Sequence, residues 1–162
     1  MNRLIALTIC IMCLVMPGYA AEKKVCTREE AIEAENEIDK LKDWDSLYNS
    51  FKRFSHCDDG AIGEGYSATV SSFLAHDWKH FTRLYRLTLS DKEFKRFILK
   101  HLDETVPIDE ARTIKLNSLK HCPSEAKSFC NLISCKLLVT AEIAEPSEEI
   151  SSEKVSGLQT CK

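Results

Sequence analysis

The first twenty residues decide which part of this chain folds. Arg3 gives the start of the segment a positive charge, an apolar run follows over residues 4–16, and Gly18 and Ala20 place small side chains at its end. This order is typical of a secretory signal peptide, and the run is shorter than the roughly 20 residues that cross a bilayer. We therefore expect cleavage after Ala20, which leaves residues 21–162 as a mature chain in the periplasm with no membrane anchor.

Cysteines are the second constraint, because an exported chain meets an oxidising compartment. Six of the eight cysteines remain after the expected cleavage. An even number in this setting predicts up to three disulfides. Their spacing lacks the paired C-x-x-C pattern of zinc sites, so no metal is expected. The disulfide candidates are Cys26, Cys57, Cys122, Cys130, Cys135 and Cys161.

Two pairings are favoured by position in the chain. Cys122 and Cys130 can approach each other if the chain turns at Pro123, and a bridge from Cys26 to Cys161 would join the two ends of the mature chain. Cys57 is an alternative partner for Cys122 or for Cys130. The remaining connectivities stay open at this point.

The charge balance narrows the class of partner. The full chain has 22 basic and 25 acidic residues, and loss of Arg3, the one charged residue of residues 1–20, changes the net charge from −3 to −4. Nucleic acids and anionic membranes select basic surfaces, so neither is expected as a partner. A protein partner is expected instead, with a second copy of the chain as an alternative. No phosphate-binding loop or dinucleotide fingerprint is present, so no cofactor is expected.

The apolar residues recur at helical spacing throughout the mature chain, which predicts an all-α fold. We expect a compact, disulfide-linked bundle of six or seven short helices in one domain over residues 21–146. Residues 147–162 are rich in Ser, Glu and Lys and are expected to form a loose tail. The aromatic residues match the predicted inner faces and are assigned to the core: Trp44, Tyr48, Phe51, Phe54, Phe73, Trp78 and Phe81.

Helix starts are marked by residues that cap free backbone amides. Thr27 with Glu30, and Ser90 with Glu93, have the spacing of capping boxes. The first of these helices is expected to run to about residue 42, and Pro107 is expected to end the helix that begins at Ser90. Other helices are expected to be capped by single acids, namely Asp43 or Asp45, Asp58 or Asp59, Asp77, and Asp109.

The stretch from Cys57 to Ser67 is the most unusual in the chain, because it combines acidic residues with three of the five glycines. Asp58, Asp59 and Glu64 would suit acid/base catalysis if burial raised the pKa of one of them. Alternatively, one aspartate caps a helix and the glycines allow close helix contact. A third interpretation makes the stretch a polar loop that enters the cleft of a partner.

Two histidines four residues apart, His76 and His80, would share a face of a continuous helix and could bind a metal together. Asp77 lies between them and favours a helix break, so both are assigned to the surface. The pairs His56-Cys57 and His121-Cys122 are adjacent only in sequence, which does not create a nucleophilic site.

A wider pattern connects this stretch to other parts of the chain. Trp44-Asp45-Ser46-Leu47-Tyr48, the motif Cys57-Asp58-Asp59-Gly60-x-x-x-Glu64-Gly65-Tyr66-Ser67, Phe97-x-x-x-His101-Leu102-Asp103, Cys122-Pro123 and Cys130 together resemble a pattern in small exported bacterial proteins of unassigned function. In architecture the chain is similar to the immunity proteins that protect bacteria from type VI secreted amidases, which are exported, helical and disulfide-bonded.

This resemblance implies a periplasmic inhibitor, not an enzyme, that blocks the active site of a wall-degrading toxin with a polar or acidic loop. The candidate loops are residues 57–67 and 104–109, and the candidate contact residues are Asp58, Asp59, Glu64, Tyr66, Glu104 and Asp109. Two alternatives stay open: a small hydrolase that uses Asp58 or Asp59 with Glu64, and a structural or envelope-stress protein.

Overall fold

The computed structural model describes residues 24–141, and this range is helical without any strand. Seven α-helices and three short 3-10 helices follow one another: α2 (Arg28–Ile38), α3 (Trp44–Phe54), η1 (Ser55–Cys57), α4 (Gly60–His76), η2 (Trp78–His80), α5 (Phe81–Ser90), α6 (Lys92–Lys100), α7 (Ile108–Lys120), η3 (Ser124–Ala126) and α8 (Lys127–Ala141). The predicted all-α bundle is therefore confirmed. The expected cleavage site and the domain boundary at residue 146 lie outside the described residues.

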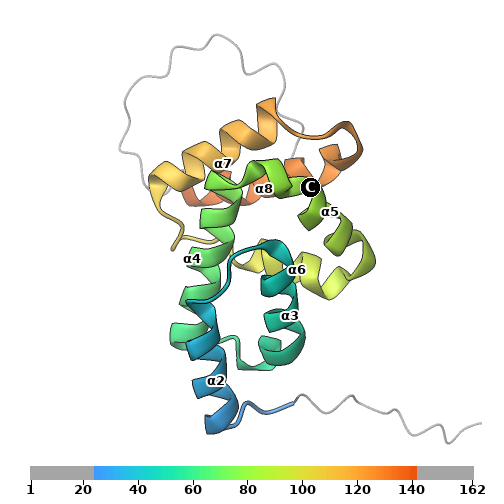
Figure 1. Cartoon of the computed structure of the whole chain (residues 1–162). Helices are drawn as coiled ribbons and strands as arrows, with labels where there is room; N and C mark the ends of the chain where they lie inside the picture. The colour runs from blue at the N-terminus through green and yellow to red at the C-terminus, as the bar shows by residue number, and fades with distance from the viewer. Residues whose placement is uncertain (1–23, 142–162) are drawn as a thin grey trace, which may run out of the picture.

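Helix α4 is the longest element of the first half of the bundle and organises its neighbours. In Figure 1, α2 lies beside the first half of α4, whereas α7 crosses its other end. Helix α3 packs against α2 and α5, and α8 packs against α7 and α6. No helix among residues 24–141 combines the length and the apolar character that a membrane crossing requires.

The core is one continuous cluster of apolar side chains. Phe51 of α3 contacts Phe94 and Phe97 of α6, and Phe81 of α5 stacks on Phe129 of α8. Such ring pairs hold the helices together by burying large apolar surfaces. The predicted core aromatics are confirmed: Trp44, Phe51, Phe54 and Phe81 are buried, and Tyr48, Phe73 and Trp78 pack against them partly buried.

Three of the expected helix starts are confirmed in detail. The Thr27 side chain accepts a hydrogen bond from the Glu30 amide, while Glu30 accepts one from the Thr27 amide. Asp43 caps α3 by accepting from the Ser46 amide. Asp59 caps α4 by accepting from the amide of Gly60 at 2.8 Å. The structural interpretation of the glycine-rich stretch therefore holds for Asp59.

Two other expected caps are wrong. Asp77 stands before η2 but its carboxylate accepts from the His80 ring, at 2.7 Å, and bonds no helix amide. Pro107, not Asp109, precedes the first turn of α7, and Asp109 lies inside that turn, where an acid suits the positive end of the helix.

The second capping box is also wrong. Ser90 remains the last residue of α5 and donates its hydroxyl to the Leu87 carbonyl, so it is not available as a cap. Asp91 caps α6 instead, by accepting from the amides of Glu93 and Phe94.

Two helix ends also differ from the expectation. Helix α2 ends at Ile38, before the expected residue 42, because the chain turns there to begin α3. Helix α6 ends at Lys100, ahead of the expected break at Pro107.

Two disulfides join described cysteines. The predicted Cys122–Cys130 bridge is present. The predicted Cys26–Cys161 bridge is wrong, because Cys26 is bonded to Cys57 where η1 packs against the start of α2. This pairing also removes Cys57 as a partner for Cys122 or Cys130. Cys135 is disulfide-bonded as well, and its partner lies outside the described residues. The disulfides indicate an oxidising environment for the folded chain.

Candidate functional site

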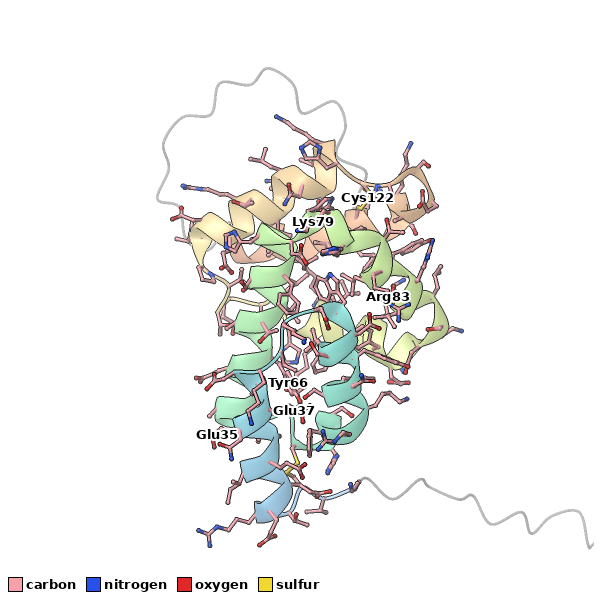
Figure 2. The ribbon with its side chains drawn as sticks, in the orientation of Figure 1. Glu35, Glu37, Tyr66, Lys79, Arg83 and Cys122 are labelled. Atoms are coloured by element: carbon pink, nitrogen blue, oxygen red, sulfur yellow. A yellow bond between two sulfur atoms is a disulfide. The ribbon has the colours of Figure 1, made fainter. Side chains whose placement is uncertain are left out.

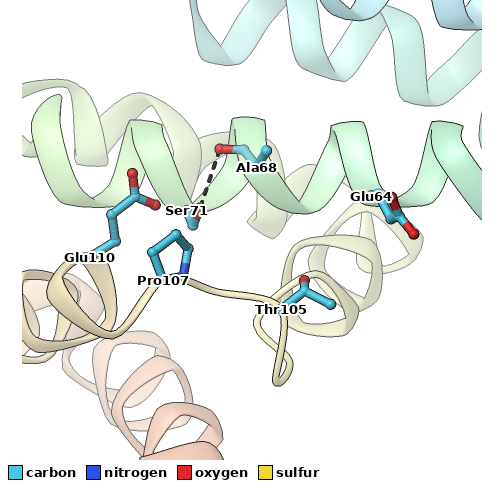
Figure 3. Close-up of a pocket in the computed structure, with 6 residues that line it drawn as sticks. All are labelled: Glu64, Ala68, Ser71, Thr105, Pro107 and Glu110. Atoms are coloured by element: carbon cyan, nitrogen blue, oxygen red, sulfur yellow. Dashed lines mark hydrogen bonds between the residues drawn. The ribbon is translucent and has the colours of Figure 1, made fainter.

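The two segments proposed as partner-binding loops meet at one pocket, which is shown in Figure 3. Its volume is about 300 Å³. Helix α4 supplies one wall, the loop after α6 supplies the other, and the start of α7 closes one end. The lining residues are Glu64, Ala68, Ser71, Thr105, Pro107 and Glu110. Residues 57–67 and 104–109 thus contribute to the same surface although they are separate in sequence.

Helix geometry explains the first wall. Glu64, Ala68 and Ser71 are spaced by four and three residues, which places them in a row on one face of α4. The Ser71 hydroxyl donates to the Ala68 carbonyl at 3.2 Å, so it adds no free donor to the pocket.

The second wall is a short loop that is held by its own hydrogen bonds. Asp103 accepts from the Thr105 amide at 2.9 Å and from the Thr105 hydroxyl at 2.6 Å. Burial raises the pKa of Asp103, but the hydrogen bonds from Thr105 outweigh it and the pKa lies below its usual range. Val106 is buried beneath the loop. The loop is thus ordered by an ionised carboxylate and an apolar anchor.

The pocket is acidic at both ends. Glu64 is exposed at one end. At the other, Glu110 has one carboxylate oxygen 3.4 Å from Nε2 of His76, while its second oxygen is buried and has no hydrogen-bond partner among residues 24–141. Glu104 and Asp109 are exposed beside the lining residues. A pocket of this kind favours a cationic group over an anionic one.

A chain of polar contacts, centred on the buried side chains of Asp58 and His101, joins two separate parts of the sequence. Asp58 is 7% exposed and contacts Nζ of Lys100 at 2.8 Å and Nε2 of His101 at 3.1 Å. The other ring nitrogen of His101, Nδ1, lies 2.9 Å from the Ser67 hydroxyl. These contacts fix the end of α6, from which the pocket loop departs.

The order of an acid, a histidine and a serine invites comparison with hydrolases. In that catalytic arrangement Nε2 of the histidine faces the serine and Nδ1 faces the acid. Here the arrangement is reversed, because Nδ1 of His101 faces Ser67 and Nε2 faces Asp58. In addition, Ser67 is only 6% exposed and His101 only 2% exposed. A substrate cannot reach the serine oxygen in this structure. The chain of contacts therefore serves to position the loop.

The ionisation of Asp58 agrees with this structural role. Burial of its carboxylate raises the pKa, but hydrogen bonds from His101 and Lys100 outweigh burial and hold the pKa below its usual range. A general acid near neutral pH needs a raised pKa. Asp58 is thus unsuited to donate a proton, and the proposed cluster with Asp59 and Glu64 separates into a buried ion pair, a helix cap and a pocket residue.

The predicted contact residues fall into two groups. Asp59, Glu64, Glu104 and Asp109 are exposed. Tyr66 is fully buried, with its hydroxyl 2.9 Å from that of Ser50, and lies inside the molecule in Figure 2. The assignment of Tyr66 and Asp58 to a partner contact does not fit their burial.

Ser67, Lys100 and His101 were not identified as interacting residues from the sequence. One signal was present: His101 follows Phe97 by one helical turn and so continues the inward row of α6. A histidine in that row predicts a buried polar partner. Which residue supplies it depends on how α4 and α6 pack, and sequence spacing does not contain this information.

One group of potential metal ligands occurs away from the pocket. Ligand atoms of Glu30, His56 and Cys57 lie within 4.8 Å of one another. The Cys57 sulfur is bonded to Cys26, and the Glu30 carboxylate already contacts Lys24, the Thr27 amide and His56, so these described residues do not offer an open set of metal ligands. His76 and His80 do not form a shared site, because their rings contact Glu110 and Asp77 respectively.

Comparison with known proteins gives no match: no family model, no curated protein and no solved structure is similar to this chain.

Proposed function

We propose that this protein is a periplasmic inhibitor, most concretely an immunity protein that covers the active site of a secreted wall-degrading toxin. The observation that carries the proposal is the meeting of residues 57–67 and 104–109 at one acidic pocket. A binding protein needs such a rigid, shaped surface and no catalytic group of its own.

Charge supports the same conclusion. An enzyme that acts on an anionic wall polymer presents a basic surface, which the exposed carboxylates of Glu64, Glu104 and Asp109 complement. The full chain is acidic, with a net charge of −3. Electrostatic complementarity of this kind accelerates association and selects the partner.

Rigidity supports it as well. The Cys26–Cys57 disulfide immobilises the segment that leads into Asp58, and the contact between Asp58 and His101 fixes the opposite wall. A binding surface that is ordered before the partner arrives loses little conformational entropy on association. Helix α4 and the loop after α6 therefore form a preorganised surface.

The rival hydrolase hypothesis has less support. Asp58, Asp59 and Glu64 have separate surroundings, and the pKa of Asp58 is lowered instead of raised. The paired carboxylates that general acid/base catalysis requires are thus not assembled at this site.

The test is inhibition of wall hydrolysis. Purified mature protein is added to type VI secreted amidases, and the clearing of bacterial wall sacculi is followed by turbidity. We expect one amidase to be inhibited at a stoichiometric amount, and inhibition to be lost in the triple variant Glu64→Lys, Glu104→Lys, Asp109→Lys.

A matched control separates this surface from total charge. The triple variant Glu29→Lys, Glu35→Lys, Asp39→Lys makes the same charge change at exposed positions on and after α2, and Glu35 points outward from that helix in Figure 2. This control is expected to inhibit like the unmodified protein. Absence of inhibition for every amidase, or equal loss in both variants, would count against the proposal.

A further inference from the structure

Four side chains with different metal-binding atoms meet where η1 packs against the start of α2, at the end of the molecule opposite to α7 in Figure 1. Ligand atoms of Glu30, His56 and Cys57 lie within 4.8 Å of one another, and the Cys57 sulfur is bonded to that of Cys26. Zinc binds carboxylate oxygen, imidazole nitrogen and thiolate sulfur. With the disulfide intact the sulfurs are not thiolates, so the group is closed to a metal in that state.

The histidine of this group has an unused nitrogen. The His56 side chain is 11% exposed, and its Nε2 is buried without a hydrogen bond to any residue of the described range. Oε2 of Glu30 lies 3.2 Å from this nitrogen, as an ion-pair contact. Buried ring nitrogens usually have a hydrogen-bond partner or a metal, because leaving one without either costs free energy. The nitrogen of His56 therefore points to a ligand that the disulfide-bonded chain does not supply.

The carboxylate of Glu30 is held in place by contacts that a metal would leave intact. Oε1 lies 2.6 Å from Nζ of Lys24, and Oε2 accepts a hydrogen bond from the Thr27 amide at 3.1 Å. A carboxylate has about four lone-pair sites, and carboxylates that bind metals are themselves oriented by such hydrogen bonds. A metal ion would replace only the contact between Glu30 and His56.

Reduction of the disulfide supplies the two missing ligands, and burial sets the direction of the reaction. Cys57 is 3% exposed, whereas Cys26 is partly exposed. A dithiol reductant therefore attacks the Cys26 sulfur, and the Cys57 sulfur leaves as a thiolate beside His56. The second thiol of the reductant then releases Cys26 from the mixed disulfide. Two electrons pass to the protein, and the reductant departs as its own disulfide.

We propose that this group is a redox-gated zinc site: after reduction of the disulfide, Cys26, Cys57, His56 and Glu30 bind one Zn²⁺ ion. Zinc displaces the protons of the two thiols, and four protein ligands complete the tetrahedral shell of a structural site. The ion then makes the link between η1 and the start of α2 that the disulfide makes in the oxidised chain. This proposal is independent of the inhibitor function, because it concerns a different part of the molecule from the acidic pocket.

The second disulfide of the described range provides an internal comparison. Cys122 and Cys130 also yield two thiols on reduction. Among residues 24–141, the only group of three potential ligands is the one at Glu30, His56 and Cys57. A tight site is therefore expected at the first disulfide and not at the second.

Cobalt binding followed by zinc competition provides the test. The purified protein is reduced with a phosphine, which is then removed without air, and Co²⁺ is added as a coloured probe. We expect one equivalent to give the visible bands of tetrahedral cobalt with a sulfur-to-metal charge-transfer band, and Zn²⁺ to displace it. The protein that has not been reduced should show neither band. His56→Ala should weaken zinc binding by at least about tenfold, whereas the exposed control His80→Ala should leave it unchanged.

Cysteine variants show which thiols bind the ion. Cys26→Ser with Cys57→Ser should abolish the charge-transfer band, and Cys122→Ser with Cys130→Ser should retain it. Far-UV circular dichroism follows the fold of each reduced protein, and His56→Ala carries the comparison if the first cysteine variant does not fold, because it keeps both thiols. The proposal is overturned if the reduced protein binds no equivalent of cobalt, if the oxidised protein binds it equally well, or if binding is unchanged in His56→Ala.

Discussion

Nε2 of His101 lies 3.1 Å from the carboxylate of Asp58, and through this contact the end of α6 is joined to the turn that precedes α4. Both groups are almost fully shielded from water. A hydrogen bond in which one partner is ionised is stronger than a neutral one, and it is costly to break inside a protein. The contact therefore affects both the stability of the fold and the shape of the acidic pocket.

The first prediction concerns the pH dependence of this contact. The pKa of Asp58 is lowered in the folded state, because hydrogen bonds from His101 and Lys100 outweigh burial. A lowered folded pKa means that the stabilisation is present above the ordinary pKa near 4 and is lost as the pH falls through the folded value. Asp58→Asn should cost about 2 kcal/mol at pH 7, and this difference should shrink below about pH 4.

Urea unfolding at pH 7 and at pH 3 measures the effect. Asp59→Asn is the matched control, because Asp59 is an exposed cap and asparagine caps equally well. The control should be nearly neutral at both pH values. An equal loss for Asp58→Asn at pH 7 and pH 3 would show that the charge on Asp58 does not contribute.

The second prediction concerns close helix contact at Gly65. A Cβ atom at this position would lie 2.6 Å and 2.9 Å from side-chain carbons of Ile38 on α2. Alanine normally favours a helix over glycine by up to about 1 kcal/mol, but this overlap should reverse the sign, and we expect Gly65→Ala to destabilise the fold by about 1–3 kcal/mol.

A double-mutant cycle with Ile38→Ala separates overlap from other causes. Removal of the Ile38 branches frees the space, so the double variant should be more stable than the sum of the two single changes predicts. Additive changes in the free energy of unfolding would contradict a contact between Gly65 and Ile38.

Much of the fold follows from local patterns in the sequence. Thr27 with Glu30 predicts a helix start because both hydrogen bonds are made within four residues. The Cys122–Cys130 bridge was predictable for the same reason, since Pro123 turns the chain within the short loop. These features depend little on what the rest of the chain does.

Features that depend on tertiary packing were not predictable in this way. Ser90 looks like a cap but bonds backwards to Leu87, and nothing local decides between these two options. Cys26 has several possible partners, and only the packing of η1 against α2 selects Cys57. At the site, Glu64 was predicted as a contact residue. Its position opposite Thr105 in the pocket depends on the contact between Asp58 and His101, which is a feature of tertiary packing.

The third prediction compares the two disulfides between described cysteines. They close loops of 31 and 8 residues. Loop-closure entropy predicts a loss of about 3.7 kcal/mol for Cys26→Ser with Cys57→Ser, and about 2.5 kcal/mol for Cys122→Ser with Cys130→Ser. Guanidinium unfolding of the two double variants measures the difference. If the pair Cys122 and Cys130 costs more, strain or residual structure outweighs loop length.

The last prediction separates an inhibitor from a serine hydrolase. A reactive serine has to be accessible to substrate and to face the base that removes its proton. The Ser67 hydroxyl faces Nδ1 of His101 but is buried on the inner side of α4, the helix to which it belongs. We therefore expect no adduct when the folded protein is treated with a fluorophosphonate probe and examined by intact mass. Ser67→Ala should lower the free energy of unfolding by about 1–2 kcal/mol, because His101 loses a hydrogen-bond partner, and it should leave toxin inhibition intact. An adduct on Ser67 that disappears in His101→Gln would show instead that the serine is activated, and the buried chain from Asp58 to Ser67 would then have to be treated as catalytic.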